Sequence, residues 1–249
     1  MKSLVLAATM ALGLVPTAKA CELALVLAID ISGSVDRREY RIQMDGLATA
    51  LNDPTVQDAL LDSKAQIAVL HWTGASRQAL ISNWRQMKER SDVIEIGQIV
   101  SDAPREYRHF STAIGDALIV SADLLGQVGE VCERKVIDVS GDGPSNEGAD
   151  VSAVRDSLVR GGVQINGLAI ETTDDTLTDY YRNKVIGGPG AFVLTAKTFE
   201  DYPRAIRRKL LREITKPVSL AGNTLPKDNF IAAVFIKITD ARLFIKAVL

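Results

Sequence analysis

The sequence predicts an α/β fold: a doubly wound, mostly parallel six-stranded sheet with one antiparallel edge strand and helices on both faces. Short apolar runs alternate with longer segments whose apolar residues recur at helical spacing, which is the pattern of a parallel sheet covered by helices. Two of the runs are separated by the turn Gly74-Ala75-Ser76, a short link that permits a hairpin. Strands are expected at residues 23–29, 66–73, 78–84, 135–140, 163–170 and 191–195.

The first strand and helix follow directly from the residue pattern. Residues 23–29 are all apolar and too few for a typical helix, so they predict a buried parallel strand. Asp36 can cap the helix that follows, and the pair Asp53-Pro54 ends it. Further helices are expected at residues 91–102, 112–125, 149–160, 175–185 and 199–214.

The two ends of the chain differ from this core. Residues 1–20 have the charged start, apolar stretch and Ala18-Lys19-Ala20 site of a signal peptide, which predicts a periplasmic or secreted protein beginning at Cys21. The apolar stretch is shorter than the roughly 20 residues of a membrane anchor. Lipid attachment at Cys21 is the alternative, although residues 18 and 19 match it poorly. The main domain is expected over residues 21–216.

Residues 217–249 form a C-terminal extension of unknown structure and role. The stretch from residue 230 onward is strongly apolar, but charged residues interrupt it, so a membrane span is not expected. These charged residues are Lys237, Asp240, Arg242 and Lys246.

Cys21 and Cys132 are the only cysteines, and each precedes an expected strand. If those strands are neighbours and parallel, a disulfide is geometrically reasonable, and an oxidising compartment would preserve it. Two unpaired thiols are the alternative.

The charge pattern argues against a nucleic-acid partner. The formal net charge is −2 and no long Lys/Arg run is present. The basic residues at 204–212 are interpreted as a solvated helix face, with docking of an acidic partner as the alternative. His71 is expected in the core and His109 in a loop, while Trp72 and Trp84 are expected to pack around the hairpin.

Oxygen-bearing side chains gather where the predicted strands end. Asp30, Ser32 and Ser34 occupy every second position of a tight turn after the first strand, Asp142 follows the strand at 135–140, and Thr112 opens a helix. In an open parallel sheet, ligands bind beyond the carboxyl ends of the strands, where the chain order reverses. These five side chains are therefore expected to share one site.

Hydroxyl and carboxylate oxygens without Cys or His favour one divalent cation, Mg²⁺ foremost, with Mn²⁺ or Ca²⁺ as alternatives, over zinc. Only two carboxylates would surround the ion, so it stays electrophilic and can accept a carboxylate from a partner. Asn146 and Glu147 follow in the same loop. We interpret them as solvated loop polarity, with support of the metal ligands through hydrogen bonds, or a ligand-selecting role, as the alternative.

The set Asp30-x-Ser32-x-Ser34, Thr112 and Asp142-Gly143 resembles the metal-ion-dependent adhesion site of von Willebrand factor A and integrin I-type domains. The order of elements fits this resemblance from about residue 23 to residue 214. Residues 139–146 further resemble a bacterial family of secreted proteins of this fold with no assigned function. The chain departs from the common pattern in having Gly141 where Thr is usual, which removes one hydroxyl, and Ser111 where Gly often precedes the Thr.

These features together predict an exported binding module rather than an enzyme. Its metal would coordinate the carboxylate of an Asp or Glu of another protein, in the cell envelope, for adhesion, assembly or sensing. The alternative is a metal-dependent hydrolase of phosphate or ester substrates, but no well-placed general base or nucleophile turn is found. A third hypothesis is a structural domain whose metal serves stability only.

Overall fold

The computed structural model describes residues 21–107, 110–128 and 132–215. The expected signal peptide, His109 and the extension at 217–249 lie outside the described residues. The described chain contains a six-stranded sheet with the order β3-β2-β1-β4-β5-β6. The strands are β1 (Leu23–Asp30), β2 (Gln66–Trp72), β3 (Gln78–Gln86), β4 (Arg134–Gly141), β5 (Val163–Ile170) and β6 (Val193–Ala196).

The sheet confirms the predicted fold class. β1 lies at its centre and pairs in parallel with β2 on one side and β4 on the other. β5 and β6 continue the parallel arrangement, and β3 pairs antiparallel with β2 at the edge. The chain order therefore reverses between β1 and β4, which places the predicted ligand-binding crevice at the carboxyl ends of these two strands.

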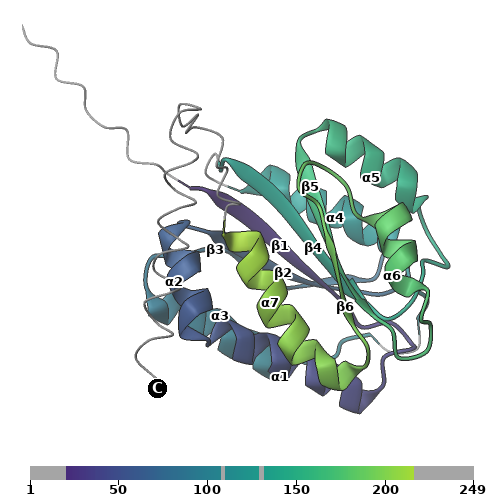
Figure 1. Ribbon diagram of the computed structural model, residues 1–249, viewed down its shortest axis with the longest axis horizontal. Helices are drawn as coiled ribbons and strands as arrows, with labels where there is room; N and C mark the ends of the chain where they lie inside the picture. The colour runs from purple at the N-terminus through teal and green to yellow at the C-terminus, as the bar shows by residue number, and fades with distance from the viewer. Residues whose placement is uncertain (1–20, 108–109, 129–131, 216–249) are drawn as a thin grey trace, which may run out of the picture. The chain divides into compact units, whose positions relative to one another are not determined.

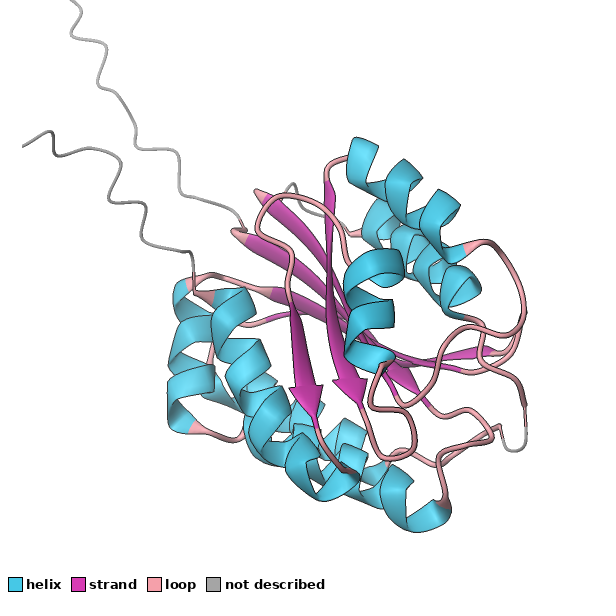
Figure 2. Cartoon of the chain, turned by 45° about the vertical axis from the view of Figure 1, so that its right-hand side comes forward, coloured by secondary structure: helices cyan, strands magenta, loops and turns pink. Residues whose placement is uncertain are grey.

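Helices cover both faces of the sheet (Figure 1, Figure 2). One face is covered by α1 (Arg37–Leu51), α2 (Pro54–Asp62), α3 (Arg90–Asp102) and α7 (Tyr202–Ile214). The other is covered by α4 (Ile114–Gln127), α5 (Val151–Arg160), α6 (Leu177–Tyr180) and the π-helical turn η1 (Tyr181–Val185). A short 3₁₀ turn, η2 (Phe199–Asp201), leads into α7.

The strands are buried on both sides, and alternate side chains serve different cores. In β1, Leu25 and Leu27 point into the core beneath α1 and α7, whereas Ala24 and Val26 point into the core beneath α4. This explains why residues 23–29 are all apolar and do not alternate with polar residues. A polar side chain on either face of the strand would be buried.

Several helix boundaries differ from the sequence prediction. The pair Asp53-Pro54 ends α1 but also begins α2, because the Asp53 carboxylate accepts hydrogen bonds from the backbone of Thr55 and Val56 and proline suits a first helical turn. The helix expected from residue 112 begins only at Ile114, so Thr112 lies in the preceding loop. The helix expected at residues 175–185 is one short α-helix followed by the π-helical turn.

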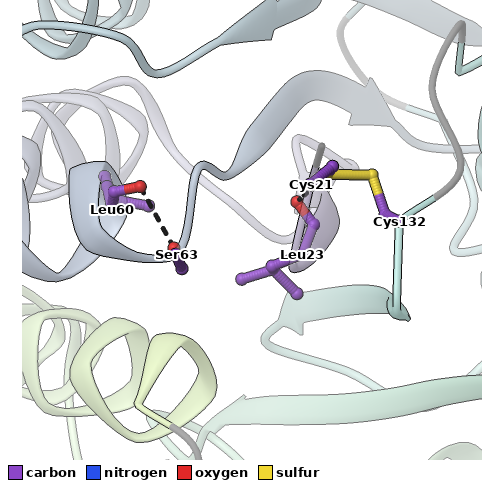
Figure 3. The surroundings of a disulfide bond; sticks show 5 residues. All are labelled: Cys21, Leu23, Leu60, Ser63 and Cys132. Atoms are coloured by element: carbon purple, nitrogen blue, oxygen red, sulfur yellow. Dashed lines mark hydrogen bonds between the residues drawn. A yellow bond between two sulfur atoms is a disulfide. The ribbon is translucent and has the colours of Figure 1, made fainter. Parts of the chain in front are cut away.

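The predicted disulfide is present (Figure 3). Cys21 and Cys132 stand just before β1 and β4, and their Cα atoms are 4.6 Å apart. The Glu133 backbone N–H donates to the Cys21 carbonyl at 3.3 Å. The bridge thus joins the amino ends of the two strands whose carboxyl ends hold the predicted site.

In the described residues, every helix is too short or too polar to cross a membrane.

Candidate metal site

The two predicted carboxylates are neighbours because β1 and β4 are neighbours. Ile29 lies opposite Ser140 in the parallel register, so the next residues, Asp30 and Gly141, lie side by side, and Asp142 follows. Both aspartate side chains are buried. The point at which the chain order of the sheet reverses therefore carries two acidic groups.

Hydrogen bonds join all five predicted residues. The Ser34 hydroxyl donates to Asp142 Oδ1 at 2.7 Å, and its oxygen lies 3.2 Å from Ser32 Oγ. The Thr112 hydroxyl donates to Ser32 Oγ at 3.3 Å. The backbone N–H of Ser32 donates to Asp30 Oδ1 at 2.7 Å. These bonds connect the loops that carry Asp30, Thr112 and Asp142.

The third loop holds Thr112 in place through Asn146. The Thr112 N–H donates to Asn146 Oδ1, and the Asn146 N–H donates to the Thr112 carbonyl, both at 2.9 Å. The interpretation of Asn146 as solvated loop polarity is incomplete, because the residue is exposed but its side-chain oxygen also accepts from Thr112. Its side chain orients a predicted ligand, and the signal that could have revealed this is its position four residues after Asp142 in a loop that must meet Thr112.

Arg105 holds the first loop, and the sequence pattern does not predict this role. Its guanidinium donates to the carbonyls of Ile31 at 3.0 Å and Ser32 at 2.6 Å. These bonds fix the backbone between Asp30 and Ser34. A lone arginine in an irregular segment gives no sequence signal for such a contact.

Burial dominates the electrostatics of the two carboxylates. Removal from water, and secondarily the nearby Asp142 charge, raise the pKa of Asp30 to about 8. Burial also raises the pKa of Asp142, opposed by the Ser34 hydrogen bond and by the positive charge of Arg105. Two buried acids held this close favour a bound cation, because a cation offsets both the desolvation and the mutual repulsion.

One oxygen of this group has no partner. Asp30 Oδ2 is buried and, among the described residues, receives no hydrogen bond. An unpaired buried carboxylate oxygen is costly unless it meets a proton or a cation. The described residues include no group of three or more His, Cys, Asp or Glu side chains arranged to hold a metal ion, so a metal here would rely on hydroxyl oxygens beside two carboxylates, which fits a hard divalent cation.

The histidine and tryptophan that the sequence places in the core are found there. His71 is buried with its Nε2 atom 3.3 Å from Met44 Sδ, and burial lowers the pKa of His71 to about 4. Trp72 is also buried. Trp84 packs against the same core as Trp72 and donates through Nε1 to the Leu124 carbonyl at 2.9 Å.

The interpretation of residues 204–212 as a solvated face is wrong for one residue. Lys209 is fully buried in α7, where it forms ion pairs with Asp138 of β4 and with Glu213. Asn166 of β5 donates to the same Glu213 carboxylate at 3.0 Å. The signal for this cluster is the pair Asp138 and Asn166, two polar residues inside otherwise apolar strands.

Solved structures share this fold at low sequence identity. Proximal thread matrix protein 1 from the mussel byssus has a TM-score of 0.58 at 18% identity, covering 79% of this chain and 48% of that chain. A von Willebrand factor type A protein from Catenulispora acidiphila has a TM-score of 0.56 at 17% identity, covering 80% of this chain and 44% of that chain. A second structure of the mussel protein has a zinc-occupied MIDAS (metal-ion-dependent adhesion site) motif. It has a TM-score of 0.56 at 17% identity, covering 78% of this chain and 46% of that chain.

The fold is therefore that of a von Willebrand factor A-like domain, as the sequence resemblance implies. The chain spans less than half the length of the mussel protein that it matches. A comparison with curated proteins gives no match. A family model matches residues 20–218, which is most of the chain. The chain belongs to the family described as protein of unknown function DUF1194.

Proposed function

We propose that this protein is an exported, metal-dependent protein-binding module. Asp30, Ser32, Ser34, Thr112 and Asp142 would hold one divalent cation, Mg²⁺ foremost. When bound, the cation supplies an electrophilic centre whose open coordination position takes an Asp or Glu carboxylate of a partner protein. The partner would belong to the cell envelope.

The Asp30 Oδ2 atom, which has no hydrogen-bond partner in the described part of the chain, is the observation that carries this proposal. The other Asp30 oxygen is already held by the Ser32 backbone, so the carboxylate is fixed in place with one oxygen unused. A side chain kept in this state is unfavourable for folding alone. A function that needs the free oxygen, such as cation binding, accounts for it.

The hydroxyl groups support a binding role for the ion. Ser32, Ser34 and Thr112 bring neutral oxygens, so only two negative charges face the cation. A dipositive ion with two carboxylates is not over-neutralised, and it keeps affinity for one more anion. Ser34 is exposed, which puts one edge of the group within reach of a partner side chain.

Other features support an extracytoplasmic location. The disulfide between Cys21 and Cys132 is of the kind that persists in oxidising compartments, and the first twenty residues have the pattern of a signal peptide. The zinc-occupied MIDAS motif of the mussel protein further supports a metal-binding role for the corresponding loops here.

A capture experiment with envelope proteins tests the proposal. Wild-type protein is immobilised and exposed to envelope extract with Mg²⁺ or with excess chelator, and captured proteins are identified. We expect a partner that is retained only with Mg²⁺ and is lost with Asp30→Ala. The control is Asp45→Ala, which also removes one acidic side chain, but an exposed one that pairs with Arg41, and it should leave capture unchanged.

Thermal unfolding of the same samples separates binding from a purely structural metal. Mg²⁺ bound to the folded state raises Tm with concentration. A rise in Tm together with metal-dependent capture supports the binding module. A rise in Tm with identical capture in chelator contradicts the proposal and leaves a metal that serves stability only.

A further inference from the structure

A tyrosine on the α4 side of the sheet lies close to Gly141 and Asp30 of the proposed metal site. Tyr181, the first residue of η1, is fully buried. A Cβ atom added at Gly141 would lie 2.7 Å from Tyr181 Oη and 2.8 Å from Asp30 Oδ2. The phenol oxygen and the unused carboxylate oxygen thus flank the same small space at the end of β4.

Two glycines make room for this ring. A Cβ atom at Gly167 of β5 would lie 2.7 Å from Tyr181 Cδ1, and one at Gly141 would meet the hydroxyl. Side chains at these positions would make contacts tighter than real Cβ atoms show, so the ring can cross β5 and reach β4 only because both residues are glycine. Gly141 is also the position at which the sequence departs from the common pattern by lacking a hydroxyl.

The Tyr181 hydroxyl bonds to no other group within the described residues. Its hydroxyl is buried without a hydrogen-bond partner, as is Asp30 Oδ2. A phenol is protonated at neutral pH and can donate a hydrogen bond. The two atoms are of complementary type and flank the same space at Gly141 without bonding to each other, which indicates a shared role, because each unpaired atom is a penalty to folding.

We propose that Tyr181 is a positioning residue of the metal site, whose hydroxyl donates a hydrogen bond to the Asp30 carboxylate when a cation is bound, in the space that a side chain at position 141 would otherwise fill. The inference rests on the proposed function, since it concerns the same site. Donors of this kind orient metal-ligating carboxylates, and their removal typically costs roughly 10- to 100-fold in metal affinity.

The test is titration calorimetry of the full chain with MgCl₂ or MnCl₂ alone, combined with thermal unfolding in chelator. Tyr181→Phe keeps the ring and removes the hydroxyl. We expect the Kd for the metal to rise about tenfold or more, while Tm in chelator stays equal or rises, because an unpaired buried hydroxyl is lost. A hydroxyl that serves only a structural hydrogen bond would lower Tm in chelator when removed, and so would move the second measurement in the opposite direction.

Tyr202→Phe is the matched control. Tyr202 is likewise a fully buried tyrosine, but it belongs to the core on the opposite face, beneath α7. Its substitution should leave the metal Kd unchanged.

Gly141→Ala provides a second, independent measurement. The added Cβ should weaken metal binding less in the Tyr181→Phe background than in the wild type, because one of its two close contacts is then gone. Equal effects in both backgrounds contradict the inference.

The outcomes distinguish the inference from the proposed function. A Tyr181→Phe protein that binds metal as tightly as the wild type, or that loses Tm in chelator, overturns the role of Tyr181 and leaves the metal site standing. A wild-type protein without measurable metal affinity overturns the site itself, and the inference with it.

Discussion

Asp30 is a buried carboxyl group that lowers the stability of the metal-free fold and that we propose as a metal ligand. Its carboxylate is buried, one oxygen is held by the Ser32 backbone, and the other is unpartnered among the described residues. The same group that would hold a cation is therefore unfavourable to the metal-free fold. Active and binding sites are where such conflicts between stability and function are expected.

Asp30→Asn should separate the two roles. The substitution keeps the shape of the side chain and removes the ionisable group. In chelator the variant should be more stable than the wild type by about 1–3 kcal/mol, since folding no longer has to raise the pKa of a buried carboxyl group to about 8. With Mg²⁺ it should gain no stability, whereas the wild type should. Denaturant unfolding with and without Mg²⁺ measures both, and a variant less stable than the wild type in chelator would contradict this account of Asp30.

At the residue level, the sequence predicts what is local and misses what is distant. Asp30, Ser32 and Ser34 are predictable because they follow one apolar run at fixed spacing, and Asp142 follows another. Arg105 acts on the first loop and Tyr181 on the end of β4, both from far along the chain. Nothing in the sequence around these two residues encodes which strand end they reach.

At the level of elements, α7 is held to the sheet by a buried ionic cluster. Lys209 lies between Asp138 of β4 and Glu213 of its own helix, and Arg134 donates to the Glu213 and Ile214 carbonyls at the helix end. Burial, and secondarily the Asp138 charge, raise the pKa of Glu213 to about 8 from its ordinary 4.5, opposed by Lys209. Two acidic side chains thus pair with the single positive charge of Lys209. One positive charge does not offset two buried negative ones, which favours keeping Glu213 protonated.

This shift predicts a stability that falls as pH rises. The folded state holds the Glu213 proton up to about pH 8, whereas the unfolded chain releases it near 4.5, so between these values the folded state binds more protons. Unfolding free energy therefore decreases with pH across this window. Glu213→Gln, which does not titrate, should flatten the decrease. Urea unfolding in chelator from about pH 5 to about pH 8.5 checks it, and equal slopes for the two proteins would count against the cluster.

The elements themselves are predictable where pattern and caps agree. The strands of the sheet follow from apolar runs, but α2 is not predicted, because the pair Asp53-Pro54 that stops one helix also caps and starts the next. Thr112 lies two residues before Ile114, where its helix begins. In this loop the backbone N–H and carbonyl of Thr112 both bond to the distant Asn146. The sequence near Thr112 gives no sign of these two bonds.

At the level of the whole molecule, the disulfide and the proposed site lie at opposite ends of the same two strands. Cys21 and Cys132 join the amino ends of β1 and β4 across 111 residues of sequence, and Asp30 and Asp142 stand at or just beyond the carboxyl ends. Removal of the bridge by Cys21→Ser with Cys132→Ser should lower the unfolding free energy by about 2–5 kcal/mol, chiefly by freeing the unfolded chain. Denaturant unfolding measures the loss.

Metal affinity should survive that change. The loops that converge on Asp30 are held by hydrogen bonds of Arg105 and Asn146 rather than by the bridge. Titration of the double variant with MgCl₂ at a temperature at which it remains folded should give a Kd close to that of the wild type. A large loss of affinity in the folded variant would show that the strand ends are not set by the loops.

We infer that three separate loops share one cation. Anomalous diffraction from crystals grown with MnCl₂ is the sharpest test, because the anomalous signal of manganese distinguishes the metal from water and protein atoms. We expect one peak in direct contact with oxygens of the Asp30, Thr112 and Asp142 loops. A fully occupied peak elsewhere, or no peak at this end of β1 and β4 at a saturating Mn²⁺ concentration, would rule out the shared cation.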